Sequence, residues 1–198
     1  MKVILATTNP GKLKEFSELA KDESWLELEL APSGFSPKET GKTFIDNAKI
    51  KALEAAKLTG TIAIADDSGI VVEALDGKPG IHSARYCEGT DADRRAKLLQ
   101  DMKGIPADRR QASFVCAMVV AEPDGSFPFN SIRVWLGQIA TEEKGSNGFG
   151  YDPIFNPNNR NCTAAELTPE EKNQVSHRAQ AFKQIVNYLK QKHAMLAQ

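Results

Sequence analysis

The sequence has few cysteines, no excess of charge of either sign and no long hydrophobic run. Its three cysteines are Cys87, Cys116 and Cys162, with no Cys-x-x-Cys pair among them, which argues against a disulfide framework or a cysteine-based zinc site. The 25 basic and 26 acidic residues give a net charge of -1, which argues against a dedicated nucleic-acid-binding protein. No stretch approaches the length of a membrane-spanning helix, and the apolar run Met1–Ala6 is too short for a signal peptide. We therefore expect a cytoplasmic protein that binds neither nucleic acid nor membranes.

What the chain does contain is the pattern of one mixed α/β domain over residues 1–198. Hydrophobic residues make up 41% and charged residues 26% of the 198 positions, which is typical of a globular domain with a real core. Helices alternate with strands in the first half and a hairpin follows, which predicts a mixed sheet. From apolar periodicity and turn signals, the expected strands are 2–6, 25–31, 61–65, 70–75, 113–121 and 127–139, and the expected helices are 10–20, 43–58, 91–103 and 169 to the C-terminus, with a second N-cap at Ser176.

The most informative feature is a pair of adjacent carboxylates, Asp66 and Asp67. They follow the apolar run Thr61–Ala65 and precede Ser68-Gly69, so we expect them in a turn at the tip of a buried strand. Neighbouring carboxylates repel each other and need solvent, cations or a metal ion, and Mg²⁺ takes hard oxygen ligands, usually together with substrate phosphates. From these residues alone, a metal and phosphate site and a solvated acidic turn are both open interpretations.

Two further segments are suited to phosphate and metal binding. In residues 6–12 a strand leads into a helix, with Asn9 as the N-cap and Pro10 at the first helical position, and a helix N-terminus attracts anions. Glu39 is a candidate metal ligand, and Lys51 lies near the apolar stripe of its helix, where an ammonium group can meet a phosphate. The alternatives are an ordinary capped connection between a strand and a helix, and a solvent-exposed lysine.

A glycine-rich loop, Gly145–Pro153, is suited to binding a nucleobase. Its three glycines flank Phe149 and Tyr151, and aromatic rings on a loop shaped by glycine can stack on a base. Asp152 can hydrogen-bond a base edge or lie near the metal. The alternative is a loop that its two aromatic rings anchor in the core.

A second polar segment follows near the start of the last helix. Ser176, His177 and Arg178 come shortly after Lys172, and these side chains supply donors for carbonyl oxygens and phosphates. The alternative is an ordinary polar turn of a helix.

Six segments carry most of the candidate site residues: Ala6–Lys12, Glu39–Ala48, Ala65–Gly69, Pro79–Tyr86, Gly148–Pro153 and Ser176–Arg178. Taken together and in this order, they resemble the inosine triphosphate pyrophosphatase family, the RdgB-like nucleoside-triphosphate pyrophosphatases. No single motif is decisive, but the ordered set is specific and spans nearly the whole chain.

The resemblance implies an elongated, two-lobed, mixed α/β sheet flanked by helices, with the active site in the cleft between the lobes. It also implies a homodimer, and Mg²⁺ as the cofactor. The implied reaction is hydrolysis of ITP, dITP and XTP between the α and β phosphates, which yields a nucleoside monophosphate and pyrophosphate. Such an enzyme removes deaminated purine nucleotides from the nucleotide pool.

The resemblance further implies roles for individual residues. Asp67 is the catalytic carboxylate that activates water, and Lys51 is a second catalytic residue that offsets phosphate charge. The implied metal ligands are Asp67, Asp66 and Glu39. The implied substrate-binding residues are Thr7, Thr8, Asn9, Pro10, Gly11, Lys12 and Ser68 for the phosphates, and Phe149, Gly150, Tyr151, Asp152, Lys172, His177 and Arg178 for the purine.

Selectivity for a 6-oxo purine has a simple physical reason in this set. A donor from His177 or Arg178 meets the 6-oxo group, whereas the 6-amino group of adenine would face that donor with another donor. Each buried group left unpaired costs roughly 1–3 kcal/mol.

Two other functions are open. The first is a Maf-type pyrophosphatase that acts on other modified nucleotides, which activity on dUTP or modified pyrimidine triphosphates would indicate. The second is a non-catalytic nucleotide-binding module, which tight nucleotide binding without pyrophosphate release would indicate.

Overall fold

The computed structural model describes residues 1–158 and 160–197, and six strands form one mixed sheet. The strands are β1 (Lys2–Leu5), β2 (Glu27–Leu30), β3 (Ala63–Val72), β4 (Gln111–Ala121), β5 (Phe129–Ile139) and β6 (Phe155–Pro157). Their order is β2-β1-β3-β4-β5-β6. β1 pairs in parallel with β2 and with β3, whereas β5 and β6 are antiparallel. The predicted mixed α/β sheet is therefore confirmed.

The helices begin at positions that local capping residues determine. The α-helices are α1 (Pro10–Leu19), α2 (Phe44–Thr59), α3 (Asp91–Asp101), α4 (Pro169–Val175) and α5 (His177–Leu196). The predicted cap of α1 is present, because Asn9 Oδ1 accepts a hydrogen bond from the Gly11 N–H at 2.8 Å. α3 is capped by Thr90 in a reciprocal capping box with Asp93, and it begins at Asp91, where the predicted helix 91–103 begins. Within the described residues, no helix is long and apolar enough to cross a membrane.

The chain forms two compact units, and each is built from separate segments. The first unit comprises Met1–Asp67, Cys116–Arg133 and Arg178–Gln198, and the second comprises Ser68–Val115 and Val134–His177. Three strands, β3, β4 and β5, each contribute residues to both units. The division of the chain into one domain over residues 1–198 stays a prediction.

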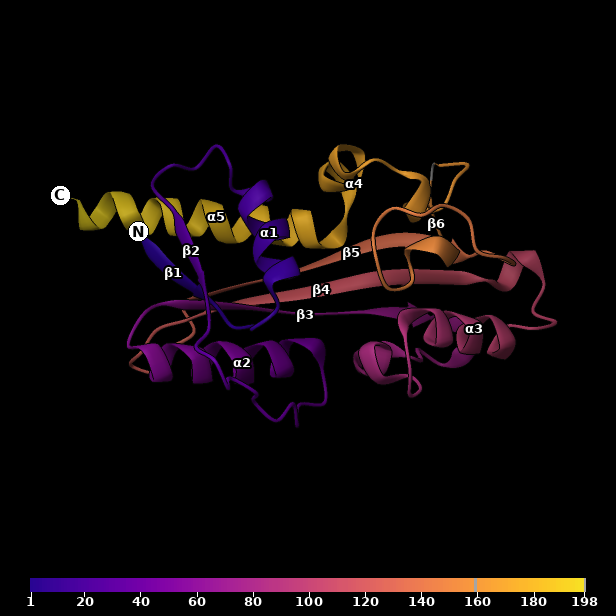
Figure 1. The fold of residues 1–198 in the computed structure, drawn as a ribbon, viewed down its shortest axis with the longest axis horizontal. Helices are drawn as coiled ribbons and strands as arrows, with labels where there is room; N and C mark the ends of the chain where they lie inside the picture. Colours follow the sequence, from indigo (N-terminus) through magenta and orange to yellow (C-terminus); the bar gives the residue numbers. More distant parts are fainter. Residues whose placement is uncertain (159, 198) are drawn as a thin grey trace. The chain divides into compact units, whose positions relative to one another are not determined.

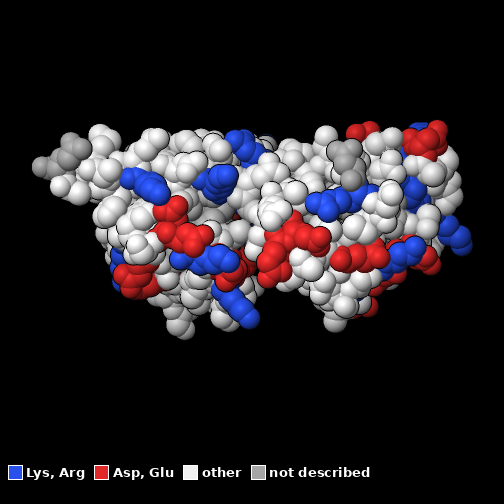
Figure 2. All heavy atoms as spheres, turned by 90° about the horizontal axis from the view of Figure 1, so that it is seen from above, with Lys and Arg blue, Asp and Glu red and all other residues white. Residues whose placement is uncertain are grey.

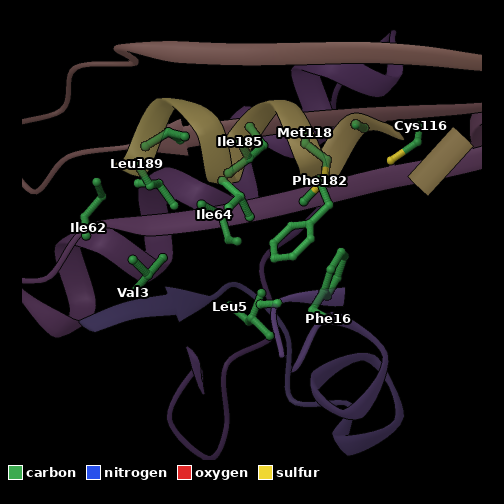
Figure 3. Packing of buried hydrophobic residues seen from close by; sticks show 14 residues of the cluster. Val3, Leu5, Phe16, Ile62, Ile64, Cys116, Met118, Phe182, Ile185 and Leu189 are labelled. Atoms are coloured by element: carbon green, nitrogen blue, oxygen red, sulfur yellow. The ribbon is translucent and has the colours of Figure 1, made fainter. Parts of the chain in front are cut away.

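In the first unit, alternate strand residues face opposite sides of the sheet, as the two-residue period of a strand requires. Val3 and Leu5 pack with Phe16 of α1 and Phe182 of α5 (Figure 3), whose rings lie 4.8 Å apart. The intervening strand residues pack against a row of alanines on α2. α1 and α5 therefore cover one face of this unit's sheet and α2 covers the other (Figure 1). Cys116 lies in the first of these cores, as expected for a small apolar residue.

The second unit has a core of its own. Leu98 of α3 and Met102, the C-cap of that helix, pack in one cluster with Ile70 of β3 and with aromatic rings of the later strands. The rings of Phe114 and Phe155 lie 4.5 Å apart in a tilted arrangement, which is a favourable geometry for an aromatic pair. Tyr151, two residues after Phe149, belongs to this core.

The predicted break between two short strands at 61–65 and 70–75 is wrong. β3 runs without interruption from Ala63 to Val72, so Asp66 and Asp67 lie inside a strand and not in a turn at its tip. The strand continues because the two carboxylates point to opposite faces, where each meets a cation. β1 ends at Leu5, opposite Ile64, so the strand end that lies near the aspartates is the end of β1.

Charged side chains of both signs are mixed on the face of the molecule that Figure 2 shows. Neither sign dominates that face, in agreement with the net charge of -1. A field of one sign, which a dedicated nucleic-acid-binding face requires, is therefore missing from the side in view.

Candidate active site

In the first unit, Asp67 on β3 lies beside two polar side chains of α2. Lys51 Nζ is 3.3 Å from Asp67 Oδ1, and Asn47 Nδ2 is 3.3 Å from Asp67 Oδ2. The same Lys51 Nζ is 3.3 Å from Glu39 Oε1. Two carboxylates that are distant in sequence therefore converge on one ammonium group, and we refer to these four residues as the Asp67 group.

Asn47, which is not among the predicted site residues, connects the segment that carries Glu39 to β3. Its Oδ1 accepts a hydrogen bond from the Gly41 N–H at 2.8 Å, and its Nδ2 donates to Asp67. A Cβ at residue 41 would lie 2.6 Å from Asn47 Oδ1, so this approach requires glycine. The only signal in the sequence was the position of Asn47 within the segment Glu39–Ala48.

The electrostatic surroundings suit Asp67 to act as a base. Burial raises the pKa of the Asp67 carboxyl, and the Glu39 carboxylate adds to this rise against the attraction of Lys51. Burial opposes the charge of Lys51, but the nearby carboxylates outweigh it and raise the pKa of its ammonium group. A carboxylate with a raised pKa is a stronger base, and Lys51 remains a cation at neutral pH.

Asp66 points to the other face of β3 and pairs with two cations. Its Oδ1 is 2.7 Å from Lys12 Nζ, and its Oδ2 is 3.3 Å from Arg178 Nη2. Arg178 also contacts Glu15 of α1, with Nη1 3.1 Å from Oε2. Burial opposes ionisation of Asp66, but Lys12 and Arg178 outweigh it and hold the pKa of this carboxyl well below its usual range. These four residues, the Asp66 group, join the first turn of α1 and the start of α5 to β3.

An exposed turn, residues 7–11, connects β1 to α1. The Asn9 N–H donates to Thr7 Oγ1 at 3.1 Å, and the Asn9 side chain caps the helix as described above. Thr8, Pro10 and Gly11 are exposed. The turn therefore presents the N-terminus of a ten-residue helix to solvent, which is a favourable place for a phosphate.

In the second unit, Phe149 lies with its ring half exposed, at 52%, beneath an ammonium group. Lys172 Nζ is 4.5 Å from the centre of the ring and 2.5 Å from Asp152 Oδ2. The Phe149 N–H donates to the same Asp152 Oδ2 at 2.9 Å. A Cβ at residue 148 would lie 2.0 Å from this oxygen, so Gly148 leaves the space for it. Asp152 thus holds both the backbone of Phe149 and the ammonium group above its ring.

Two other residues predicted for the purine are buried in the second unit. Tyr151 is 6% exposed, and its hydroxyl donates to the Ser83 carbonyl at 2.7 Å, which favours the anchoring interpretation for this ring. His177 stacks on Phe114, with ring centres 4.8 Å apart and planes at 6°.

Comparison with known proteins identifies the family of this chain. A model of the Ham1 family matches residues 3–188. The chain belongs to the Ham1 family. It is 48% identical over 195 residues to a dITP/XTP pyrophosphatase of Photorhabdus laumondii, which covers 96% of this chain and 98% of that protein.

Solved structures of Ham1 proteins agree with this assignment. A HAM1 protein from Coxiella burnetii superposes with a TM-score of 0.87 at 42% identity, over 96% of this chain and 99% of that one. A nucleoside-triphosphatase, dITP/XTP pyrophosphatase, from Mycobacterium abscessus has a TM-score of 0.77 at 46% identity, over 93% of this chain and 98% of that one. The resemblance inferred from the ordered motifs is therefore confirmed.

In this Ham1 chain, the predicted site residues outside the turn 7–11 lie in three places. Asp67, Lys51 and Glu39 meet on the α2 side of β3. Lys12, Asp66 and Arg178 meet on the side of α1 and α5, so Arg178, which was predicted to read the purine, lies in the first unit. The second unit holds Ser68, the loop residues 149–152, Lys172 and His177.

The predicted set of three metal-binding carboxylates is not assembled, because neighbouring residues of a strand point to opposite faces. Asp66 is occupied by Lys12 and Arg178. Among residues 1–158 and 160–197, no group of three or more His, Cys, Asp and Glu side chains is arranged to hold a metal ion. Asp67 and Glu39 do converge on one cation, and two carboxylates that act together with substrate phosphates fit the usual coordination of Mg²⁺.

Proposed function

We propose that this chain hydrolyses dITP, ITP and XTP to the nucleoside monophosphate and pyrophosphate, and so removes deaminated purine nucleotides from the nucleotide pool. Relatives named dITP/XTP pyrophosphatases, which match this chain over nearly their full length, support the reaction class and the substrates. The observation that carries the proposal is the buried Asp67 carboxyl, whose pKa is raised, beside the Lys51 ammonium group. The family assignment favours this function over a Maf-type enzyme or a binding module.

The phosphate chain binds at the turn 7–11 and the start of α1, with Ser68 as a further donor. Backbone N–H groups at a helix N-terminus and the positive end of its dipole favour phosphate oxygens. Lys12 and Lys51 add two positive charges, which a triphosphate requires because its own negative charge repels an attacking nucleophile. Lys12 is paired with Asp66, so a phosphate group competes with that carboxylate for the ammonium group.

Asp67 acts as the general base. It accepts a proton from a water molecule while the water oxygen forms a bond to a phosphorus atom of the α–β linkage. The bond between that phosphorus and the bridging oxygen breaks, and the bridging oxygen keeps the electron pair. Asn47 and Lys51 hold the Asp67 carboxylate in place, and a general base of this kind contributes about 10²–10⁴-fold to the rate.

Asp67 and Glu39 are the residues that would hold Mg²⁺. When bound, the ion supplies charge neutralisation and polarisation of the phosphoryl oxygens. The Lys51 ammonium group contacts both carboxylates, and its positive charge keeps them close to each other.

The purine binds at the second unit's loop. Phe149 stacks on the base, an interaction worth about 1–3 kcal/mol, and Lys172 and His177 offer donors to its edge. Asp152 acts by fixing Phe149 and Lys172. That Arg178 donates to the 6-oxo group, as the family resemblance implies, stays a prediction.

Two copies of the chain associate, and we assign their contact to β5. Ile132, Val134 and Leu136 alternate along this strand and are 47%, 45% and 59% exposed, which makes one apolar stripe. A stripe of this kind is typical of a protein–protein contact, and a second copy is the partner that the family resemblance implies. We place the enzyme in the cytoplasm, where nucleotide pools are kept and where its three cysteines stay reduced.

A panel of substrates tests the proposed function. Pyrophosphate release is measured as kcat/KM for dITP, ITP, XTP, ATP, GTP and dUTP, with Mg²⁺ and with excess chelator. We expect turnover of dITP, ITP and XTP that stops in excess chelator. We expect kcat/KM for ATP to be at least about 100-fold lower than for ITP, because the 6-amino group would leave both itself and a buried donor of the protein unpaired. Equal values for ITP and ATP, or a preference for dUTP, would contradict the proposal.

A further inference from the structure

α3 holds the loop that carries Phe149, a role that nothing in the proposed function uses. The Gly150 N–H donates to Asp91 Oδ2 at 3.1 Å, and Arg95 Nη1 donates to the Gly150 carbonyl at 2.9 Å. Asp91 and Arg95 are four residues apart on α3, so their side chains lie on one face of the helix. Both peptide groups of Gly150 are therefore fixed from the same helix.

Arg95 joins the two ends of this loop. Besides Gly150, it contacts Glu143, with Nε 2.9 Å from Oε1. The Arg95 side chain is only 14% exposed, whereas that of Glu143 is 41% exposed. A planar guanidinium group fits two partners at fixed angles, which a lysine cannot do. The stretch 143–150 is thus closed by one side chain.

These contacts matter because Gly150 is conformationally permissive. It has a φ of +59°, in the left-handed region that glycine enters and leaves at low cost. Its N–H belongs to the peptide group that also contains the Phe149 carbonyl, so the bond to Asp91 fixes the direction in which the chain leaves Phe149. The half-exposed ring of Phe149 beneath Lys172 depends on that direction.

We propose that Arg95 and Asp91 are positioning residues, which hold the loop 143–150 so that Phe149 is ready to stack on the base and thereby lower KM for the nucleotide. This inference rests on the proposed function, because it takes Phe149 as the stacking residue. Arg95 and Asp91 do not touch the reacting groups, so they act on binding of the base and not on the chemical step.

Steady-state kinetics of Arg95→Ala test this role. We expect KM for ITP to rise at least about fivefold, since stacking on one base is worth about 1–3 kcal/mol, with kcat within about twofold of wild type. Arg95→Lys keeps the positive charge but loses the planar guanidinium group that contacts two partners at once, so we expect a KM between those of wild type and Arg95→Ala. Lys97→Ala is the matched control, because Lys97 lies on the same helix but pairs with Asp101 at 3.0 Å and should leave KM unchanged. An unchanged KM in Arg95→Ala would overturn the proposal.

A double-mutant cycle separates positioning of Phe149 from a general loss of structure. If Arg95 acts through the ring, its removal should change KM less than about twofold in a Phe149→Ala background, because effects along one chain of contacts are not additive. Full additivity of the two changes would mean that Arg95 acts elsewhere and would refute the proposed role.

Hydrogen exchange of the protein without nucleotide tests the same role independently of turnover. Amides of residues 143–152 should exchange faster in Arg95→Ala than in wild type or in Lys97→Ala, because opening of the loop becomes easier. Identical exchange would overturn the proposal even if KM changed. If the wild-type enzyme released no pyrophosphate from any purine triphosphate, the proposed function would fail, and exchange alone would decide whether Arg95 holds the loop.

Discussion

Asp66 and Asp67 are neighbours in the sequence, but they meet different partners on opposite faces of β3. Asp66 is an ion-pair partner of Lys12 and Arg178, whereas Asp67 lies with Lys51 and Asn47. At the scale of the residue, we propose that Asp66 supports the structure and that Asp67 takes part in the reaction, and the two roles can be tested separately.

Replacement of Asp67 should remove activity and leave the fold intact. In Asp67→Asn we expect kcat to fall at least about 100-fold, as the loss of a general base predicts, because the amide cannot take a proton from water. Pyrophosphate release from ITP measures the loss, and circular dichroism with urea unfolding checks the fold. Turnover within a few-fold of wild type would remove Asp67 from the role of base.

Replacement of Asp66 should instead destabilise the protein. Asp66→Ala leaves the buried Arg178, whose side chain is 7% exposed, without one of its carboxylate partners, and breaking a buried pair in this way costs about 3–5 kcal/mol. The free energy of unfolding in urea measures this cost, with the exposed Asp22→Ala as the control. A loss below about 1 kcal/mol would show that the Asp66 group contributes little to stability.

At the scale of the element, the caps of α1, α2 and α4 were predictable and the course of β3 was not. A cap depends on a few consecutive residues, such as Thr43 with Asp46, so the sequence contains the whole signal. β3 passes through two carboxylates only because α1, α2 and α5 bring cations to them. Arg178 and Asp66 are 112 positions apart, and no local sequence pattern predicts such a contact.

The contacts of the candidate site likewise depend on residues that are distant in the sequence. The ordered motifs predicted the segments of the candidate site, yet the contacts of Asn47 and Arg95 emerged only from the folded structure, because Asn47 contacts Asp67, 20 positions away, and Arg95 contacts Gly150, 55 positions away. The three-residue strand β6 was also missed, since so short a segment contains no recognisable alternation.

A tyrosine links the segment before α3 to the end of that helix, and its contribution depends on pH. The Tyr86 hydroxyl donates to Asp101 Oδ2 at 2.5 Å, and this hydrogen bond is the main cause that lowers the pKa of Asp101. A lowered pKa stabilises the folded state above the ordinary aspartate pKa of about 4, and this stabilisation is lost as the pH falls below it.

We therefore expect Tyr86→Phe to lower the free energy of unfolding by about 1 kcal/mol at neutral pH. The difference from wild type should shrink as the pH falls through about 4 towards 3. Urea unfolding at several pH values measures it, and a difference that grows with acidity would contradict this account of Asp101.

At the scale of the whole molecule, β5 should determine the oligomeric state. We expect the wild-type chain to sediment as a dimer and Leu136→Asp to shift it towards the monomer, because a charge in an apolar contact is not compensated. Ile132 and Val134 on the same stripe should respond in the same way, whereas Gln191→Asp, at an exposed position of α5 outside this strand, serves as the control. Analytical ultracentrifugation gives the answer, and a wild-type monomer at all concentrations would refute the assignment.

The products formed from ITP in the presence of Mg²⁺ test the central claim most directly. Separation of the nucleotide products by chromatography, with an assay for pyrophosphate, distinguishes cleavage at the α–β linkage from cleavage at the β–γ linkage. We predict IMP and pyrophosphate in equal amounts, formed at least about 100-fold more slowly by Asp67→Asn. IDP and inorganic phosphate, or no product from the wild-type enzyme, would contradict the proposed reaction.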